Sequence, residues 1–221
     1  MIVINFPHNP TGSHLDAATQ RRLVEIADEA GALLFSDEVY RGLEYRSDDR
    51  LPAAADLSFS AVSLGVLSKA FALAGLRIGW LATRRAALLD RVARLKDYTT
   101  ICSSAPSEIL ALIALRRHEA VLARSGDIVT SNLALAVEFV SQHRDEIEWA
   151  PPRAGSVAFP RFRNRDAAGI SERLATTRGA LLMPGAVFGA DPSHFRLGLG
   201  RKDFREALQA LREELGSSAP L

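Results

Sequence analysis

The stretch that decides the fold class is residues 2–37, which open with Ile2-Val3-Ile4-Asn5-Phe6 and close with Ala32-Leu33-Leu34-Phe35-Ser36-Asp37. Each end is a short apolar run next to turn-forming or polar residues, a pattern typical of a buried strand. Between them the apolar residues follow helical spacing, and Ser13 or Asp16 is placed to cap the helix. Strand, helix and strand over about forty residues predict a right-handed βαβ unit, and therefore an α/β fold with a mainly parallel sheet.

Further strands and helices are predicted along the rest of the chain. Apolar runs at residues 60–67 and 77–82 indicate a third and a fourth strand, and helical spacing covers residues 84–95, 106–116 and 120–143. After a pair of prolines the pattern changes to strand-like runs at 156–162, 180–183 and 195–199, followed by a helix over 203–215. We therefore expect a large domain over residues 1–130 and a small C-terminal α+β domain over residues 131–221.

Composition excludes several classes of protein. The 27 basic and 26 acidic residues give a net charge of +1, which leaves no basic excess for binding nucleic acid. Cys102 is the single cysteine and the five histidines are scattered, so neither a disulfide framework nor a metal site is expected, and Cys102 is predicted to be buried. The first apolar run stops at Pro7, too short for a signal peptide or a membrane span, so we expect a cytoplasmic protein.

Polar side chains follow each of the first three predicted strands. Asn9, Asp37 and the pair Ser68-Lys69 stand at these positions. Ligands of open α/β sheets bind beyond the carboxyl ends of parallel strands, so we expect these residues to gather at one edge of the sheet. Each has an ordinary alternative role, since Asn9 suits a turn before Pro10, Asp37 can cap a strand end, and most lysines are simply solvated. Their coincidence at one edge predicts a site.

Four segments follow one another along the chain: Asn9-Pro10-Thr11-Gly12, Ser36-Asp37-Glu38-Val39-Tyr40, the thirteen residues from Ser68-Lys69 through Arg77 to Trp80, and Phe195-Arg196-Leu197-Gly198. Together they resemble the class I/II aminotransferases, which are pyridoxal-phosphate enzymes of fold type I. The lysine segment is also similar to that of histidinol-phosphate aminotransferases. This resemblance implies a partial large domain of that fold followed by the small C-terminal domain.

The resemblance implies that the cofactor is pyridoxal 5'-phosphate and that Lys69 binds it covalently and shuttles the substrate α-proton. Lysine suits both tasks because its amine loses its charge readily when it is buried or lies near another cation. By the same resemblance Asp37 pairs with the pyridine nitrogen, and Asn9 and Tyr40 donate hydrogen bonds to the phenolic oxygen of the ring. Tyr40 has a second interpretation, as an amphipathic packing residue.

Three further residues have implied roles in binding anionic groups. Arg77 corresponds to the arginine that holds the cofactor phosphate, and Ser68 adds a hydroxyl to it. Many relatives place a serine or threonine three residues before the lysine, where this chain has Val66, so one phosphate contact of the family pattern is missing. Arg196 corresponds to the arginine that binds the substrate α-carboxylate, whereas Arg201 is interpreted as a surface residue.

The activity that the resemblance implies is transfer of an amino group between an α-amino acid and a 2-oxo acid. The same residues also support lyases, decarboxylases and cyclases, including enzymes similar to capreomycidine synthase. A third alternative is an inactive fragment that acts at most as an interaction module. The matched segments belong to the C-terminal portion of the family, so we expect a chain truncated at its N-terminus and, at full length, a homodimer. The substrate side chain is not readable from these residues.

Overall fold

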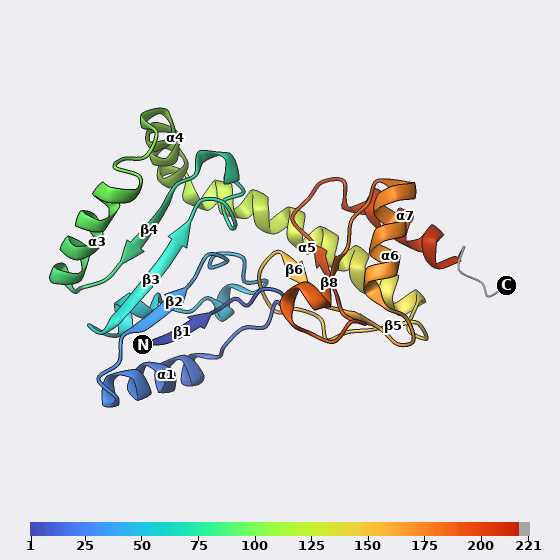
Figure 1. Ribbon diagram of the computed structural model, residues 1–221, viewed down its shortest axis with the longest axis horizontal. Coiled ribbons are helices and arrows are strands. Elements are labelled where there is room, and N and C mark those ends of the chain that lie inside the picture. Colours follow the sequence, from blue (N-terminus) through green and yellow to red (C-terminus); the bar gives the residue numbers. More distant parts are fainter. Residues whose placement is uncertain (217–221) are drawn as a thin grey trace. The chain divides into compact units, whose positions relative to one another are not determined.

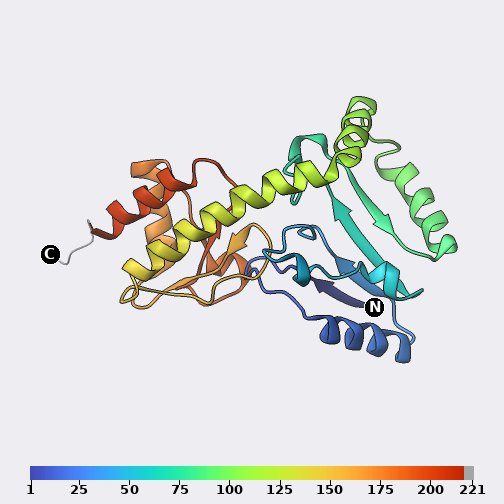
Figure 2. The same cartoon turned by 180° about the vertical axis from the view of Figure 1, so that it is seen from behind.

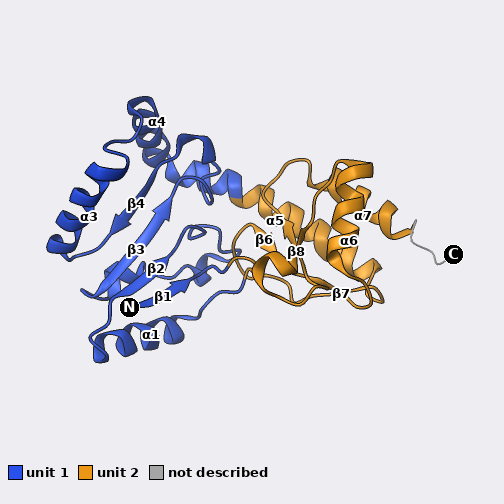
Figure 3. Cartoon of the chain, viewed as in Figure 1, with its two compact units in different colours: residues 1–8, 13–125 blue, residues 9–12, 126–221 orange. Residues whose placement is uncertain are grey.

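The computed structural model of the chain describes residues 1–216. It contains two compact units, which Figure 3 shows in different colours. Unit 1 comprises residues 1–8 and 13–125, and unit 2 comprises residues 9–12 and 126–221. The boundary at residues 125 and 126 falls within a helix, so the chain passes between the units without a loop there. Each unit has its own sheet and its own apolar core.

The sheet of unit 1 has four strands in the order β1 (Ile2–Asn5), β2 (Leu34–Asp37), β3 (Ala61–Val66) and β4 (Gly79–Ala82), as Figure 1 shows. The first three strands are parallel, which confirms the predicted α/β fold with a mainly parallel sheet. In this register Asn5 pairs with Asp37 and Asp37 with Leu64, so the carboxyl ends of β1 and β2 lie level.

Helix α1 (Ala17–Glu29) joins β1 to β2 and lies alongside them in both views (Figures 1 and 2). Of the two predicted caps Asp16 is the one used, because its Oδ1 accepts a hydrogen bond from the Thr19 amide at 2.7 Å. Val24 and Ala27 on the inner face of α1 are buried against a cluster that includes Leu34 and Ala61 of the sheet. The short helix α2 (Ala54–Leu57), which follows the 3₁₀ turn η1 (Ser47–Asp49), adds to the same cluster.

The fourth strand begins later than predicted and pairs antiparallel with β3. It begins at Gly79 rather than at residue 77, because the chain first makes the 3₁₀ turn η2 (Ala74–Leu76) and Arg77 then takes a left-handed conformation with φ +56°. A parallel neighbour of β3 would need a long crossover connection, which is usually helical. No α-helix lies between β3 and β4, so the chain turns back directly and β4 pairs antiparallel with β3.

Three helices follow: α3 (Ala86–Thr99), α4 (Ala105–Arg116) and α5 (His118–Gln142). Ser104 occupies the N-cap position of α4 as predicted, although its side chain makes no capping hydrogen bond. The prediction that Cys102 is buried is wrong, since this free cysteine is exposed in the connection between α3 and α4. None of the helices within residues 1–216 is long and apolar enough to cross a membrane.

Unit 2 carries two small antiparallel sheets. In one, β9 (Phe195–Gly198) lies between β6 (Val157–Ala158) and β8 (Met183–Pro184), and in the other β5 (Ile147–Glu148) pairs with β7 (Arg161–Phe162). The single strand predicted over residues 156–162 is therefore two strands, interrupted at Pro160, which has no amide hydrogen for a ladder bond. Helix α6 (Ala167–Arg173), a π-helical turn η3 (Leu174–Arg178), the 3₁₀ turn η4 (Gly185–Phe188) and helix α7 (Phe204–Gly216) complete the unit.

Candidate active site

Asp37 is the last residue of β2, and several hydrogen bonds fix its position. Its backbone oxygen accepts from the Asn5 Nδ2 and from the Phe6 amide, both at 3.2 Å. Its carboxylate Oδ1 accepts from the Val39 amide, also at 3.2 Å. The side chain is half-buried, and within residues 1–216 it makes no ion pair. The carboxylate thus caps the turn that follows β2 and keeps its negative charge unmatched.

Glu38 anchors the same turn and was not singled out from the sequence. Its Oε1 accepts from the Ala54 amide and from the Ser63 hydroxyl, both at 2.8 Å, and Ser63 in turn accepts from the Ala55 amide at 3.0 Å. These bonds join the end of β2 to β3 and α2. A second carboxylate directly after Asp37, next to a buried strand, is the sequence signal that could have indicated this role.

Tyr40 and Lys69 lie together in unit 1. Tyr40 is 4% exposed and packs with Leu43 and Ala70, so it does have the packing role that the sequence left open. The Lys69 ammonium Nζ lies 5.9 Å from the centre of the Tyr40 ring, and the side chain of Lys69 is exposed. In the turn that carries Lys69, the Leu73 amide donates to the Leu67 oxygen at 2.9 Å.

Ser68 and Arg77, predicted to bind the cofactor phosphate, belong to the same connection between β3 and β4. Ser68 is half-buried, whereas Arg77 is exposed, and its Nη1 donates only to the Ala74 oxygen at 3.2 Å. Neither Arg77 nor Lys69 forms an ion pair with any residue in the described part of the chain. Unit 1 therefore presents Asp37, Lys69 and Arg77 as three charged groups without internal counterions.

Arg196 and Asn9 meet within unit 2. Arg196 stands in β9 between the buried Phe195 and Leu197, and its Nη1 donates to the Asn9 Oδ1 at 3.0 Å. Its guanidinium carbon lies 5.1 Å from the centre of the Phe188 ring. Arg196 is half-buried, and no carboxylate among residues 1–216 pairs with it. A half-buried arginine held by an amide oxygen and an aromatic ring is suited to bind an external anion.

The segment that carries Asn9 is held in unit 2 by its backbone. The Gly12 oxygen accepts from the Arg153 amide at 2.9 Å and from the Ala154 amide at 3.2 Å. Gly12 has φ +66°, and a Cβ there would lie 2.3 Å from the Pro152 Cβ, so only glycine fits. The sequence predicted Asn9 at one edge with Asp37 and Lys69; in the structure Asn9 belongs to unit 2 and the other two to unit 1.

Arg201 and His8 lie close in the sequence to predicted site residues, and their surroundings explain their own roles. Arg201 is exposed and pairs with Asp203 through two hydrogen bonds of 2.8 and 2.7 Å, which confirms it as a surface residue. Burial lowers the pKa of His8, in the loop after β1, below its ordinary value. No group of three or more potential metal ligands occurs among the residues that the structure describes.

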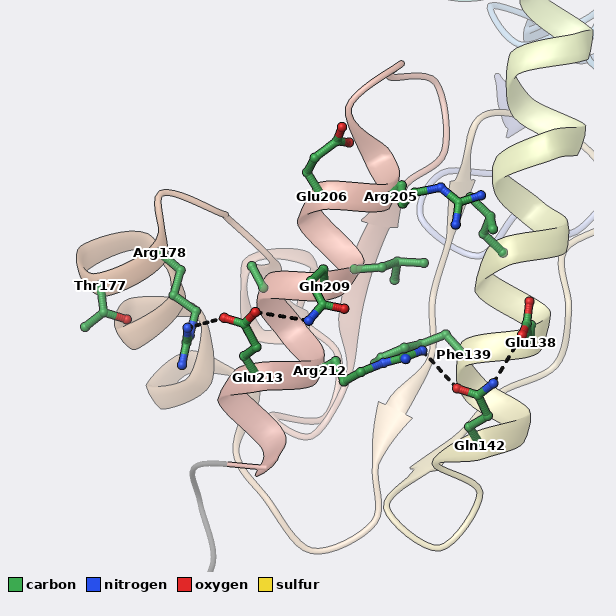
Figure 4. Close-up of a pocket in the computed structure, with 13 residues that line it drawn as sticks. Glu138, Phe139, Gln142, Thr177, Arg178, Arg205, Glu206, Gln209, Arg212 and Glu213 are labelled. Atoms are coloured by element: carbon green, nitrogen blue, oxygen red, sulfur yellow. Dashed lines mark hydrogen bonds and ion pairs between the residues drawn. The ribbon is translucent and has the colours of Figure 1, made fainter.

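A hollow of about 740 Å³ lies on unit 2, and none of the predicted site residues lines it (Figure 4). It is lined by α5, α7 and the π-helical turn. Its polar side chains are largely paired with one another, since Arg178 and Gln209 both bind Glu213, and Arg212 binds Gln142. We therefore interpret this hollow as a surface groove crossed by structural hydrogen bonds.

Comparison with known proteins decides the family. The sequence profile described as "Aminotransferase class I and II" matches residues 1–211. The chain belongs to the class I and II aminotransferase family. This match confirms the resemblance drawn from the four segments. Capreomycidine synthase from Streptomyces vinaceus is 32% identical to this chain over 99% of its residues. An aspartate aminotransferase from Thermococcus kodakarensis is 28% identical over 97% of it.

Solved structures show the same fold. A PLP-dependent aminotransferase from Streptococcus suis superposes with a TM-score of 0.91 at 29% identity, and a PLP-dependent cyclase, OrfR, with 0.89 at 33% identity. The two superpositions cover 100% and 98% of this chain, but the chain spans 58% and 59% of the length of the two solved structures. The chain likewise spans 56% of the length of both curated relatives named above. The fold is therefore that of PLP-dependent aminotransferases, over part of their length.

Proposed function

We propose that the protein acts as a pyridoxal-phosphate-dependent aminotransferase, which moves an amino group between an α-amino acid and a 2-oxo acid. The observation that carries the proposal is the set of charged groups without internal counterions: Asp37, Lys69 and Arg77 in unit 1, and Arg196 in unit 2. Charged groups that make no ion pair in the fold are available to a ligand of complementary charge. The four groups named are one carboxylate, one amine and two guanidinium groups, all at positions of the family segments.

The donor set fits pyridoxal 5'-phosphate by its chemistry. The Asp37 carboxylate would pair with the pyridine nitrogen, the Arg77 guanidinium and the Ser68 hydroxyl would bind the phosphate, and the Lys69 amine would bind the aldehyde. Asn9 and Tyr40 would donate hydrogen bonds to the phenolic oxygen of the ring. When bound, this cofactor supplies an electron-accepting ring that stabilises negative charge at the substrate α-carbon.

Lys69, Asp37 and Arg196 would each have a separate role in the reaction. The Lys69 amine would take up and return the proton of the substrate α-carbon, which requires an uncharged amine. The Asp37 carboxylate would keep the ring nitrogen protonated. Arg196 would hold the α-carboxylate of the substrate through two parallel N–H···O bonds.

The covalent assignment is tested by trapping. The chain has three lysines, Lys69, Lys96 and Lys202, so borohydride reduction in the presence of pyridoxal 5'-phosphate followed by peptide mass spectrometry can identify the residue that holds the cofactor. We expect the label on Lys69, and an absorbance band that is lost in Lys69→Ala and retained in the matched controls Lys96→Ala and Lys202→Ala. A label on either of the other lysines, or a band that survives in Lys69→Ala, would contradict the assignment.

A second candidate function is favoured by two of the relatives. A capreomycidine synthase and a PLP-dependent cyclase are 32% and 33% identical to this chain, which supports a cyclase or lyase acting on an amino acid. The two functions differ in stoichiometry. Given an amino acid alone, an aminotransferase forms one equivalent of 2-oxo acid per site and stops until a second 2-oxo acid is added, whereas a cyclase or lyase continues to turn over.

We further propose a cytoplasmic homodimer. The exposed free thiol of Cys102 suits a reducing compartment. Support for self-association comes from α4, whose large apolar side chains are exposed: Ile109 62%, Leu110 51%, Leu112 50% and Ile113 55%. A helix that is apolar on all sides normally packs against protein on more than one side.

A further inference from the structure

We propose that Phe188 is a positioning residue for Arg196, and that it orients the guanidinium for the carboxylate of the substrate. This inference rests on the proposed function and assigns a role to a residue outside the predicted site. The centre of the Phe188 ring lies 5.1 Å from the guanidinium carbon, within the range of a cation–π contact. The negative face of the ring attracts the cation and restrains its rotation.

Phe188 leaves the hydrogen-bonding capacity of Arg196 almost untouched. A guanidinium has five N–H donors, and a ring contact uses none of them. Among the residues described, the single hydrogen bond of the Arg196 side chain is the one from Nη1 to the Asn9 Oδ1 at 3.0 Å. The ring and the amide together fix the plane and the rotation of the guanidinium, while donors remain for a planar carboxylate.

The fold holds the Phe188 ring firmly in this place. The Phe188 ring meets the ring of Phe159 edge to face, at 5.7 Å and 85°, and Phe159 in turn stacks on His194 at 5.0 Å and 21°. Arg196, Phe188, Phe159 and His194 therefore form a continuous series of contacts. His194 stands two residues before Arg196 and directly precedes β9, so the series returns to the segment that leads into the strand of the arginine.

The backbone of η4 is tied to the same strand. The Gly185 amide, at the start of η4, donates to the His194 oxygen at 2.6 Å, and β8, just before it, pairs with β9 so that Met183 lies opposite Arg196. A Cβ on Gly185 would lie 2.7 Å from the His194 Cβ and from the Asp191 oxygen, so this close approach requires glycine. The turn that carries Phe188 thus has little freedom to move away from Arg196.

The positioning role is tested first by a signal that needs neither cofactor nor activity. In the 221-residue chain, ring current from Phe188 displaces the NMR resonance of the Arg196 Nε–H group, which is identified by its loss in Arg196→Lys. We expect the displacement to disappear in Phe188→Leu, to persist in Phe188→Tyr, and to be unaffected in Val187→Ala, an exposed neighbour on the same turn. An unchanged Arg196 resonance in a folded Phe188→Leu variant would overturn the proposal.

The consequence for binding is measured on the cofactor-loaded chain. L-Alanine and ethylamine differ by the carboxylate alone, so the ratio of their affinities, read from the cofactor absorbance, reports recognition of the carboxylate. We expect Phe188→Leu to lower this ratio roughly 3- to 30-fold and Phe188→Tyr to restore it. An equal ratio in Phe188→Leu and in the unmodified chain would refute the role of Phe188 and leave the proposed function standing. Absence of any Lys69-dependent band would instead refute the proposed function, and the NMR measurement would still decide the contact.

Discussion

At the scale of single residues, the contrast between Arg196 and Arg201 shows how surroundings separate two arginines that are five positions apart. Arg201 is exposed and saturated by a two-point contact with Asp203. Arg196 is half-buried, contacts an amide oxygen and an aromatic ring, and has no acidic partner within residues 1–216. Partial burial of a cation is costly unless an anion compensates it, so Arg196 has the greater capacity to gain from a bound carboxylate.

The charge of Asp37 can be separated from its structural role by an isosteric change. Asp37→Asn retains an oxygen that accepts from the Val39 amide but removes the negative charge. We expect the stability of the chain to change little and the affinity for pyridoxal 5'-phosphate to fall roughly 10- to 100-fold, as for the loss of a charged hydrogen bond. Cofactor titration and thermal unfolding measure the two effects. If Asp37→Asn binds the cofactor as tightly as the unmodified chain, the proposed contact with the pyridine nitrogen is wrong.

At the scale of elements, ion pairs join α7 to α6 and to the π-helical turn in unit 2. The Glu214 side chain is 8% exposed and accepts from Arg173 at 2.6 Å, and Arg178 lies 3.9 Å away. Arg178 also pairs with Glu213 at 2.5 Å. A buried carboxylate that loses a partner retains its desolvation penalty, so this network holds the two helices in one arrangement.

Removing Arg173 should therefore destabilise unit 2. We expect Arg173→Met to lower the free energy of unfolding by on the order of 2 kcal/mol, a value reduced from that of a fully buried pair because Arg173 itself is 52% exposed. Arg22→Met is the matched control, because Arg22 pairs with Glu25 and Glu29 on the exposed face of α1. Urea denaturation should show no measurable effect of the control. Equal effects of the two variants would contradict a special role for Glu214.

At the scale of the whole molecule, the exposed apolar face of α4 is the feature that internal packing leaves unexplained. The buried residues of this helix are two small ones, Ala111 and Ala114, whereas its larger side chains face outward. A surface of this kind commonly marks a contact with more protein. It is the basis for the proposed homodimer.

Charges placed on this face test that proposal. We expect the double change Ile109→Glu with Ile113→Glu to weaken self-association about a hundred-fold or more, since two large apolar side chains, each contributing about 1.5–3 kcal/mol on burial, are replaced by carboxylates. Analytical ultracentrifugation over a concentration series measures the change, with Val137→Glu, an exposed site on α5 in unit 2, as the control. An identical association constant in the double variant would exclude α4 from the interface.

The sequence by itself determined the βαβ unit, the mainly parallel sheet and the family. These depend on local signals: apolar periodicity, the Asp16 cap, and four ordered segments that include Asp37, Lys69 and Arg196. The later strands were predicted less accurately, because Pro160 divides one of them and the turn through Arg77 delays the start of another.

The partners of each predicted residue became known from the three-dimensional packing. In the structure Glu38 anchors the turn beside Asp37, and Cys102 is exposed to solvent. Asn9 contacts Arg196, which is 187 residues away in the chain, and Phe188 packs against that arginine. The contacts join residues that are far apart in the chain, and the exposure of a residue depends on which elements cover its segment. Hydrophobic periodicity carries no information about either. Sequence patterns specify each element through its own residues, whereas a site is specified by the packing of elements against one another.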